Sequence, residues 1–194
     1  MAATVLHSNV TVNFNGRPIT VTVTASGSVV DEWINTTISL GEMHLSRGCL
    51  LIGMSMDRGG NTLHLCVNSR CLIFQISRAD SILISFRLFL LNRDCKFAGF
   101  LNQWHRTTLA DSKHHLLMYK GSFDLRFLNR SCFDNSMQDI IHKCVGWKVE
   151  LKDEIRSSNW YEPTLSDDQV VFACIESYCA FIVARDCNLR RYLF

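Results

Sequence analysis

The sequence predicts an α/β protein: a mixed central sheet with helices on both faces, and an N-terminal hairpin and helix appended to it. Three observations lead to this prediction. Two hairpin patterns occupy the first half of the chain, a nearly continuous apolar strand lies between them, and segments with helical periodicity follow. The 194 residues, 47% of them hydrophobic and 20% charged, are expected to form one domain over residues 1–194.

The first elements are a hairpin and a helix. Residues 9–24 alternate apolar and polar side chains around Asn15-Gly16, a pair that favours the positive φ angles of a tight turn. Ser28 is a predicted helix cap, because two acidic residues follow it at the positive end of the helix dipole.

The middle and the end of the chain supply the other elements. The segment from Cys49 to Met56 is nearly all apolar, as expected for a strand covered on both faces. Residues 62–67 and 71–76 flank a short turn and predict a second hairpin. The patterns then predict a helix over 80–91, a strand over 96–100, helices over 102–111 and 135–145, an irregular segment over 147–164, and a last helix capped by Ser166 and Gln169.

Charge and cysteine usage restrict the class of protein. A formal net charge of +2 gives little overall attraction to nucleic acid or to anionic membranes, so affinity for nucleic acid must come from a local site. The nine Cys mostly lie in apolar runs without CxxC or zinc-ligand spacing, which indicates buried free thiols. The polar start and the lack of a long apolar run predict an intracellular protein, cytoplasmic or nuclear, with no membrane partner.

Five residues are expected to line one cleft. Ser55 and Asp57 share one face of the apolar strand, at the carboxyl end where open α/β sheets bind ligands. His105 lies at the start of the helix that follows the next strand. Phe172 and Glu176 are four residues apart, so they share one face of the last helix.

The segments around these residues resemble a known family. Residues 51–57, LIGMSMD, resemble the first motif of DnaQ-like (DEDD-type) 3′–5′ exonucleases, in which apolar residues lead to Asp-x-Glu. Residues 97–105 resemble the second motif, and residues 169–176 the third, Gln-x-x-Tyr-Ala-x-x-Asp. Residues 12–33 and 61–75 are similar to the Werner-type exonucleases of plants, a subgroup that includes the RISC-interacting clearing exoribonucleases. The order, spacing and extent of the motifs carry the resemblance.

The resemblance implies a ribonuclease H-like fold and a site where four carboxylates hold two Mg²⁺ or Mn²⁺ ions while a helix Tyr positions water. These ions prefer oxygen ligands, and a pair of them activates water and stabilises the leaving oxygen. The motif positions for Asp, Glu, Asp, Tyr and Asp are taken here by Ser55, Asp57, His105, Phe172 and Glu176. Two of four carboxylates remain, so catalysis is expected to be weak or lost.

Two functions stay open at this point. The first is hydrolysis of single-stranded RNA or DNA, with Asp57, Glu176 and Ser55 in the metal site and His105 and Phe172 in catalytic positions. The second is an inactive subunit that binds nucleic acid or assembles with active relatives. The resemblance also implies a ring-like homo-oligomer and RNA-silencing proteins as partners.

Simpler structural roles compete with these functions. Asp57 also fits a solvated turn residue, and Phe172 a core aromatic. Glu176 interrupts an apolar helix, so its carboxylate either faces a cleft or has a partner. Three arginines near the C-terminus fit a solvated tail better than a phosphate contact: Arg185, Arg190 and Arg191. Nucleophilic catalysis by Ser55 is disfavoured, because no elbow motif surrounds it.

Overall fold

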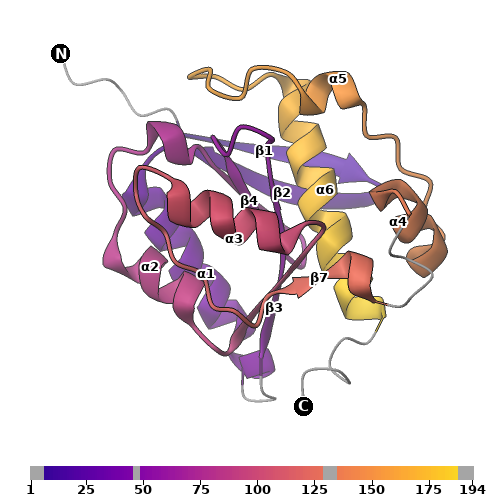
Figure 1. Ribbon diagram of the computed structural model, residues 1–194, viewed down its shortest axis with the longest axis horizontal. Coiled ribbons are helices and arrows are strands. Elements are labelled where there is room, and N and C mark those ends of the chain that lie inside the picture. The colour runs from indigo at the N-terminus through magenta and orange to yellow at the C-terminus, as the bar shows by residue number, and fades with distance from the viewer. Residues whose placement is uncertain (1–6, 46–48, 129–134, 188–194) are drawn as a thin grey trace.

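The computed structural model describes residues 7–45, 49–128 and 135–187, so Arg190 and Arg191 lie outside the described residues. Its sheet has the strand order β1-β2-β5-β4-β3-β6-β7. Figure 1 shows the sheet with its helices. The strands are β1 (His7–Phe14), β2 (Arg17–Thr24), β3 (Leu50–Met56), β4 (Leu63–Val67), β5 (Arg70–Phe74), β6 (Cys95–Gly99) and β7 (Phe123–Asp124). The α-helices are α1 (Gly27–Leu45), α2 (Ile84–Leu91), α3 (Asn102–Asp111), α4 (Met137–Val145), α5 (Asp153–Arg156) and α6 (Asp167–Asp186), and two short 3-10 helices are η1 (Ile76–Arg78) and η2 (Leu125–Phe127).

The sheet is mixed, as predicted. β3 pairs antiparallel with β4 and parallel with β6, and β4 pairs antiparallel with β5. The N-terminal hairpin is appended at one edge, where β2 runs parallel to β5. Its turn has φ angles of 48° at Asn15 and 71° at Gly16, which confirms the predicted tight turn.

Helices cover both faces of the sheet. One apolar layer joins the strands to α1, α2 and α3 through buried side chains that include Trp33, Phe86 and Leu109. The layers on the other face join them to α4 and α6 through Ile140 and Phe181, among others. The predicted α/β fold class is therefore confirmed.

Gly53 lets α6 lie directly on β3. A Cβ atom at this position would meet the backbone oxygen of Ser177 and lie 2.5 Å from the backbone nitrogen of Phe181. Only a residue without a side chain permits this approach. The contact fixes α6 over β3 and so places Glu176 beside the end of the strand.

Helix ends were predicted with mixed success. Ser166 forms the predicted capping box with Gln169. The predicted Ser28 cap is wrong, because α1 begins one residue earlier. The backbone N–H of Gly27 donates to Asp80 Oδ1 at 2.9 Å, a cap supplied from a distant segment. The helix predicted over 80–91 begins only at Ile84.

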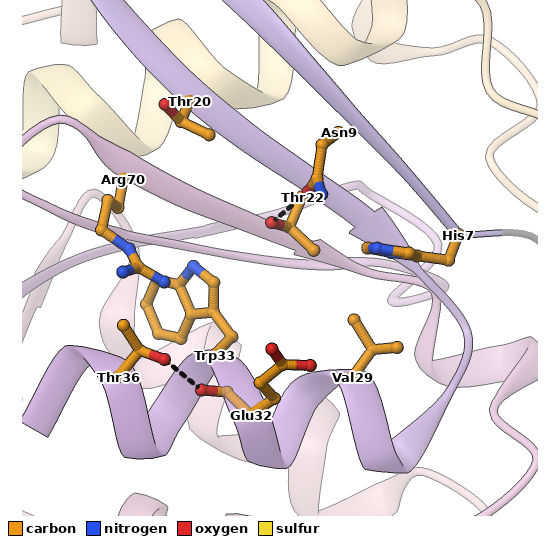
Figure 2. Close-up of a pocket in the computed structure, with 9 residues that line it drawn as sticks. All are labelled: His7, Asn9, Thr20, Thr22, Val29, Glu32, Trp33, Thr36 and Arg70. Atoms are coloured by element: carbon orange, nitrogen blue, oxygen red, sulfur yellow. Dashed lines mark hydrogen bonds between the residues drawn. The ribbon is translucent and has the colours of Figure 1, made fainter.

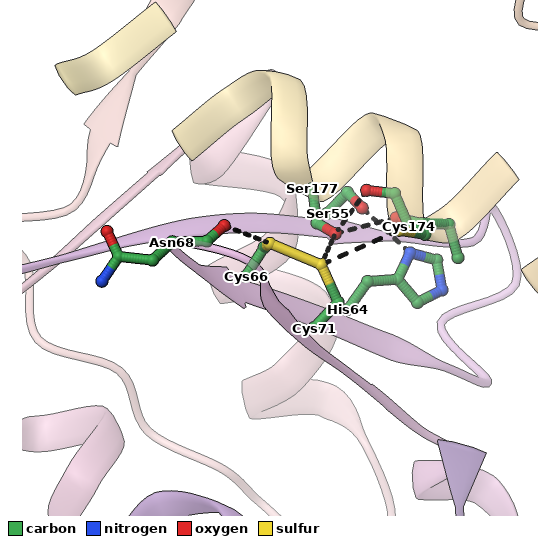
Figure 3. The surroundings of a disulfide bond; sticks show 8 residues. Ser55, His64, Cys66, Asn68, Cys71, Cys174 and Ser177 are labelled. Carbon is green, nitrogen blue, oxygen red and sulfur yellow. Dashed lines mark hydrogen bonds between the residues drawn. A yellow bond between two sulfur atoms is a disulfide. The ribbon is translucent and has the colours of Figure 1, made fainter. Parts of the chain in front are cut away.

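The cysteine prediction needs one correction. Cys66 and Cys71 are directly opposed on β4 and β5 and form a disulfide (Figure 3), whereas free thiols were expected. Their pairing depends on strand register, which the cysteine spacing alone does not give. Other cysteines are buried and free, as predicted: Cys49, Cys95, Cys174 and Cys179. Within the described ranges, no helix is long and apolar enough to cross a membrane.

Candidate functional site

A cleft of about 390 Å³ opens beside the carboxyl end of β3. Two of the five predicted site residues, His105 and Glu176, line it. Ser55, Asp57 and Phe172 are buried nearby, with 3–5% of their surface exposed. The residues that line the cleft are Met56, Arg58, Phe100, Leu101, Trp104, His105, Arg126, Met137, Arg156 and Glu176.

Glu176 both faces the cleft and has a half-buried partner. Its Oε1 lies 3.4 Å from Nη2 of Arg156, and the carboxyl side chain is only 9% exposed. Burial raises the pKa of Glu176 from its ordinary value of 4.5 to about 7, although the neighbouring Arg156 opposes the shift. The guanidinium of Arg156 lies over the ring of Phe172, 5.3 Å from its centroid. A permanent cation therefore sits against the carboxylate expected to hold metal.

Asp57 is committed to its own loop. Its Oδ1 accepts hydrogen bonds from the backbone N–H of Thr62 at 2.6 Å and from the Thr62 hydroxyl at 2.9 Å. Its Oδ2 accepts from Gly59 N–H at 2.8 Å and Asn61 Nδ2 at 3.1 Å. A carboxylate offers about four acceptor positions, so this set uses its capacity. Asp57 is a turn residue, as the alternative structural hypothesis proposed, but it is buried and not solvated.

A buried network joins Asp57 to Ser55. His64 Nε2 lies 2.8 Å from the Thr62 hydroxyl. Its Nδ1 lies 2.9 Å from the Ser55 hydroxyl (Figure 3). Ser55 also lies near Glu176, and its hydroxyl lowers the pKa of that carboxyl group. Burial lowers the pKa of His64 to about 3, so its ring is neutral at pH 7.

Burial, and not this network, favours the neutral form of Glu176. Three links join Asp57, Thr62, His64 and Ser55 in series. The two hydroxyls and the neutral imidazole supply one proton each, which satisfies all three links. The pKa of Glu176 is raised chiefly because its carboxyl group is buried, while Arg156 and Ser55 oppose the shift.

His105 is a neutral wall of the cleft. Asn102 donates through Nδ2 to the backbone oxygens of Phe97 and Phe123, so its Oδ1 acts as the acceptor. His105 Nδ1 lies 3.0 Å from that oxygen and therefore carries the proton. Burial lowers the pKa of His105 to about 4, which leaves Nε2 as a neutral acceptor.

These residues do not fit a two-metal centre. The oxygens of Asp57 are used by its loop, and Glu176 faces a guanidinium. Phe172 carries no hydroxyl and packs against Trp160, with ring centroids 6.1 Å apart. In the part of the chain that the structure describes, no group of three or more His, Cys, Asp or Glu is placed to hold a metal ion. Two ions would have too few free anionic ligands here.

Positive charge dominates the cleft. Three arginines line it against one carboxyl group, and the sequence interpretation assigned none of them: Arg58, Arg126 and Arg156. Arg126 is partly neutralised by Asp124, to which its Nη2 donates at 2.8 Å. Arg126 and Arg156 lie in the short helices η2 and α5, and Arg58 follows β3, so no periodicity marks any of them. Their only sequence signal is the adjacency of Arg58 to the first motif.

Apolar side chains form the mouth of the cleft. Trp104 is 37% exposed and Leu101 is 40% exposed. Leu101 has a φ of 74°, a left-handed conformation that is strained for a residue with a branched side chain. The strained turn presents an aliphatic side chain and an indole ring together at the rim.

No protein-family model and no curated protein sequence matches the chain. Several solved structures are similar to the chain. The EXO domain of Aedes aegypti Nibbler has 14% sequence identity and a TM-score of 0.66, with 88% of each chain covered. Brucella melitensis NrnC bound to pGG has 14% identity and a TM-score of 0.57, over 75% of this chain and 74% of that one. A nuclease in its apo form has 15% identity and a TM-score of 0.59, over 75% and 74%. The chain thus has the fold of ribonuclease H-like exonuclease domains.

Proposed function

We propose that the cleft binds single-stranded nucleic acid without hydrolysing it. The observation that carries this proposal is the contact between Arg156 and Glu176, in which a guanidinium supplies the positive charge next to the motif carboxylate. Guanidinium groups are always charged at neutral pH and recognise phosphate with paired N–H donors. The cleft is therefore suited to binding phosphate groups without a metal ion.

The rest of the cleft supports a single-stranded ligand. Trp104 offers an exposed ring face on which an unpaired base stacks, and such stacking tolerates any base. His105 Nε2 accepts a hydrogen bond from a sugar hydroxyl or a base amine. A volume of about 390 Å³ suits one nucleotide at a time. NrnC, a protein of the same fold, has been solved bound to pGG, which also supports a nucleic-acid ligand.

Metal-dependent hydrolysis is the second candidate, and the fold favours it. It requires Asp57 and Glu176 to release their present partners and to hold Mg²⁺ or Mn²⁺ with Ser55. Breaking the hydrogen bonds of a buried carboxylate is costly, so the closed network of Asp57 opposes this function.

We further propose a plant Werner-type origin, a ring-like homo-oligomer, RNA-silencing proteins as partners and a single domain over residues 1–194.

A binding assay with matched variants tests the proposal. Fluorescence anisotropy of a short labelled RNA and of a DNA of the same sequence is measured with the full chain in EDTA. Arg58→Gln and Arg156→Gln are expected to weaken binding of both strands about tenfold and to reduce the salt dependence. Arg93→Gln, an exposed arginine outside the cleft, is the matched control. Arg58 is exposed, so its variant is expected to fold normally.

A parallel cleavage assay separates the two candidates. The same strands, labelled at the 3′ end, are incubated with the protein in Mg²⁺ or Mn²⁺, and no shortening is expected. Shortening that disappears when Asp57→Ala and Glu176→Ala are combined would establish hydrolysis. Binding that Arg58→Gln and Arg156→Gln leave unchanged would remove the cleft from the interaction.

A further inference from the structure

A second cavity lies between α1 and the outer hairpin. Its volume is about 350 Å³, and it shares no lining residue with the cleft. Arg70 and Thr20 reach it from the sheet, while Glu32 and Trp33 reach it from α1 (Figure 2). The cavity therefore combines a cation, an anion, a hydroxyl and an aromatic ring.

Arg70 brings unused donors to this cavity. It lies at the start of β5 and is half-buried, and burial lowers the pKa of its guanidinium while the charge of Glu32 raises it. No acceptor from the described ranges lies within hydrogen-bond or ion-pair distance of this guanidinium, although arginine carries five N–H donors. A partly desolvated cation without such a partner is poised to bind an external acceptor.

Trp33 and Glu32 provide complementary groups. The indole of Trp33 is 3% exposed, and none of the described residues accepts a hydrogen bond from its Nε1–H. In Figure 2 the indole lies between the side chains of Arg70 and Glu32. Glu32 is exposed on α1, and its carboxylate accepts no hydrogen bond from the described side chains or backbone. Arg70 and Trp33 thus offer hydrogen-bond donors to the cavity, and Glu32 offers an acceptor.

We propose that this cavity binds a guanine base. A simple anion is repelled by Glu32 and a simple cation by Arg70, so the ligand must offer acceptors and donors on one body. Guanine has paired acceptors, O6 and N7, which arginine binds through two N–H groups. Its N1–H and N2–H donors lie next to these acceptors and suit a carboxylate. Adenine offers N7 beside a donor amine, so it leaves one arginine donor unpaired. This site does not depend on the function of the cleft.

Calorimetric titration tests the proposal. Guanosine, adenosine, cytidine and uridine are titrated separately into the full chain. Saturable binding is expected for guanosine, with affinity for the other three at least about tenfold lower. Arg70→Gln and Glu32→Gln are each expected to lower guanosine affinity by a similar factor. Arg93→Gln, which lies outside both the cavity and the cleft, is expected to leave it unchanged.

Several results would overturn the guanine site. These are the absence of saturable guanosine binding, equal binding of all four nucleosides, or guanosine binding that is lost in Arg156→Gln but kept in Arg70→Gln. Glu32 is exposed on its helix, so Glu32→Gln keeps the test decisive even where Arg70→Gln fails to fold. Unchanged guanosine affinity in a folded Glu32→Gln variant would also contradict the proposed recognition.

Discussion

Replacing Glu176 with Gln is expected to make the protein more stable at neutral and alkaline pH. Burial raises the pKa of Glu176, so the folded protein favours the neutral carboxyl group. Ionisation places a charge in a site where the side chain is only 9% exposed. A Gln amide cannot ionise, so the variant avoids this cost.

The size of the effect follows from the pKa shift of Glu176. The shift from 4.5 to about 7 corresponds to at most about 3 kcal/mol, since one pKa unit equals about 1.4 kcal/mol. Between these pH values the folded state binds more protons than the unfolded state, so the free energy of unfolding falls as pH rises. The contribution of neutral Glu176 is fully present below about pH 4.5 and is lost by about pH 8.

Urea unfolding from pH 5 to pH 8.5 measures this prediction. The stability of Glu176→Gln relative to the unmodified protein should increase by up to about 3 kcal/mol across this range. Glu154→Gln, an exposed change on α5, should show no such trend. A constant difference between Glu176→Gln and the unmodified protein at every pH would refute the raised pKa of Glu176.

Three further substitutions test the packing and the chemistry. Asp57→Ala should lower the free energy of unfolding by about 3 kcal/mol, because buried N–H and O–H donors lose their acceptor. Asp111→Ala, an exposed change, should alter this free energy little. Equal effects of the two variants would contradict the loop network. Gly53→Ala should prevent α6 from docking and lower the melting temperature far more than Gly16→Ala. The Gly16 variant strains only a turn residue with a φ of 71°, and its added Cβ meets nothing within 4 Å. Similar melting temperatures would contradict the close helix–strand contact. Phe172→Tyr restores the hydroxyl that the exonuclease motif carries, but cleavage of single-stranded RNA should stay undetectable because the metal ligands are still missing; cleavage by this variant would show that the missing hydroxyl alone limits activity.

Local patterns predicted most of the fold because each element carries its own signal. The hairpin turn at residues 15–16, the capping box of Ser166 and the apolar strand before Asp57 are all short-range features, and the structure contains each of them. The two-residue strand β7 was missed, since a segment this short shows no periodicity. The α1 cap was missed because Asp80 supplies it from 53 residues away.

The candidate site was predictable in position but not in charge. Of the five residues that the spacing predicted to line one cleft, the structure places His105 and Glu176 in its lining. Arg156 was missed because it comes from a four-residue helix within a segment predicted to be irregular. Its contact with Glu176 is a tertiary one, and the spacing of the two residues gives no indication of it. The hydrogen bonds that occupy the Asp57 carboxylate were missed for the same reason, because they depend on how the loop after β3 closes.

Metal independence of nucleic-acid binding is tested most directly by one titration performed under two conditions. The affinity of the protein for a short single-stranded RNA is measured in EDTA and again in Mn²⁺ at matched ionic strength, because unmatched salt alone changes such affinities. If the guanidinium of Arg156 supplies the positive charge beside Glu176, the two dissociation constants should agree within about twofold and the RNA should remain intact. Binding that requires Mn²⁺, or shortening of the RNA in its presence, would contradict this role of Arg156.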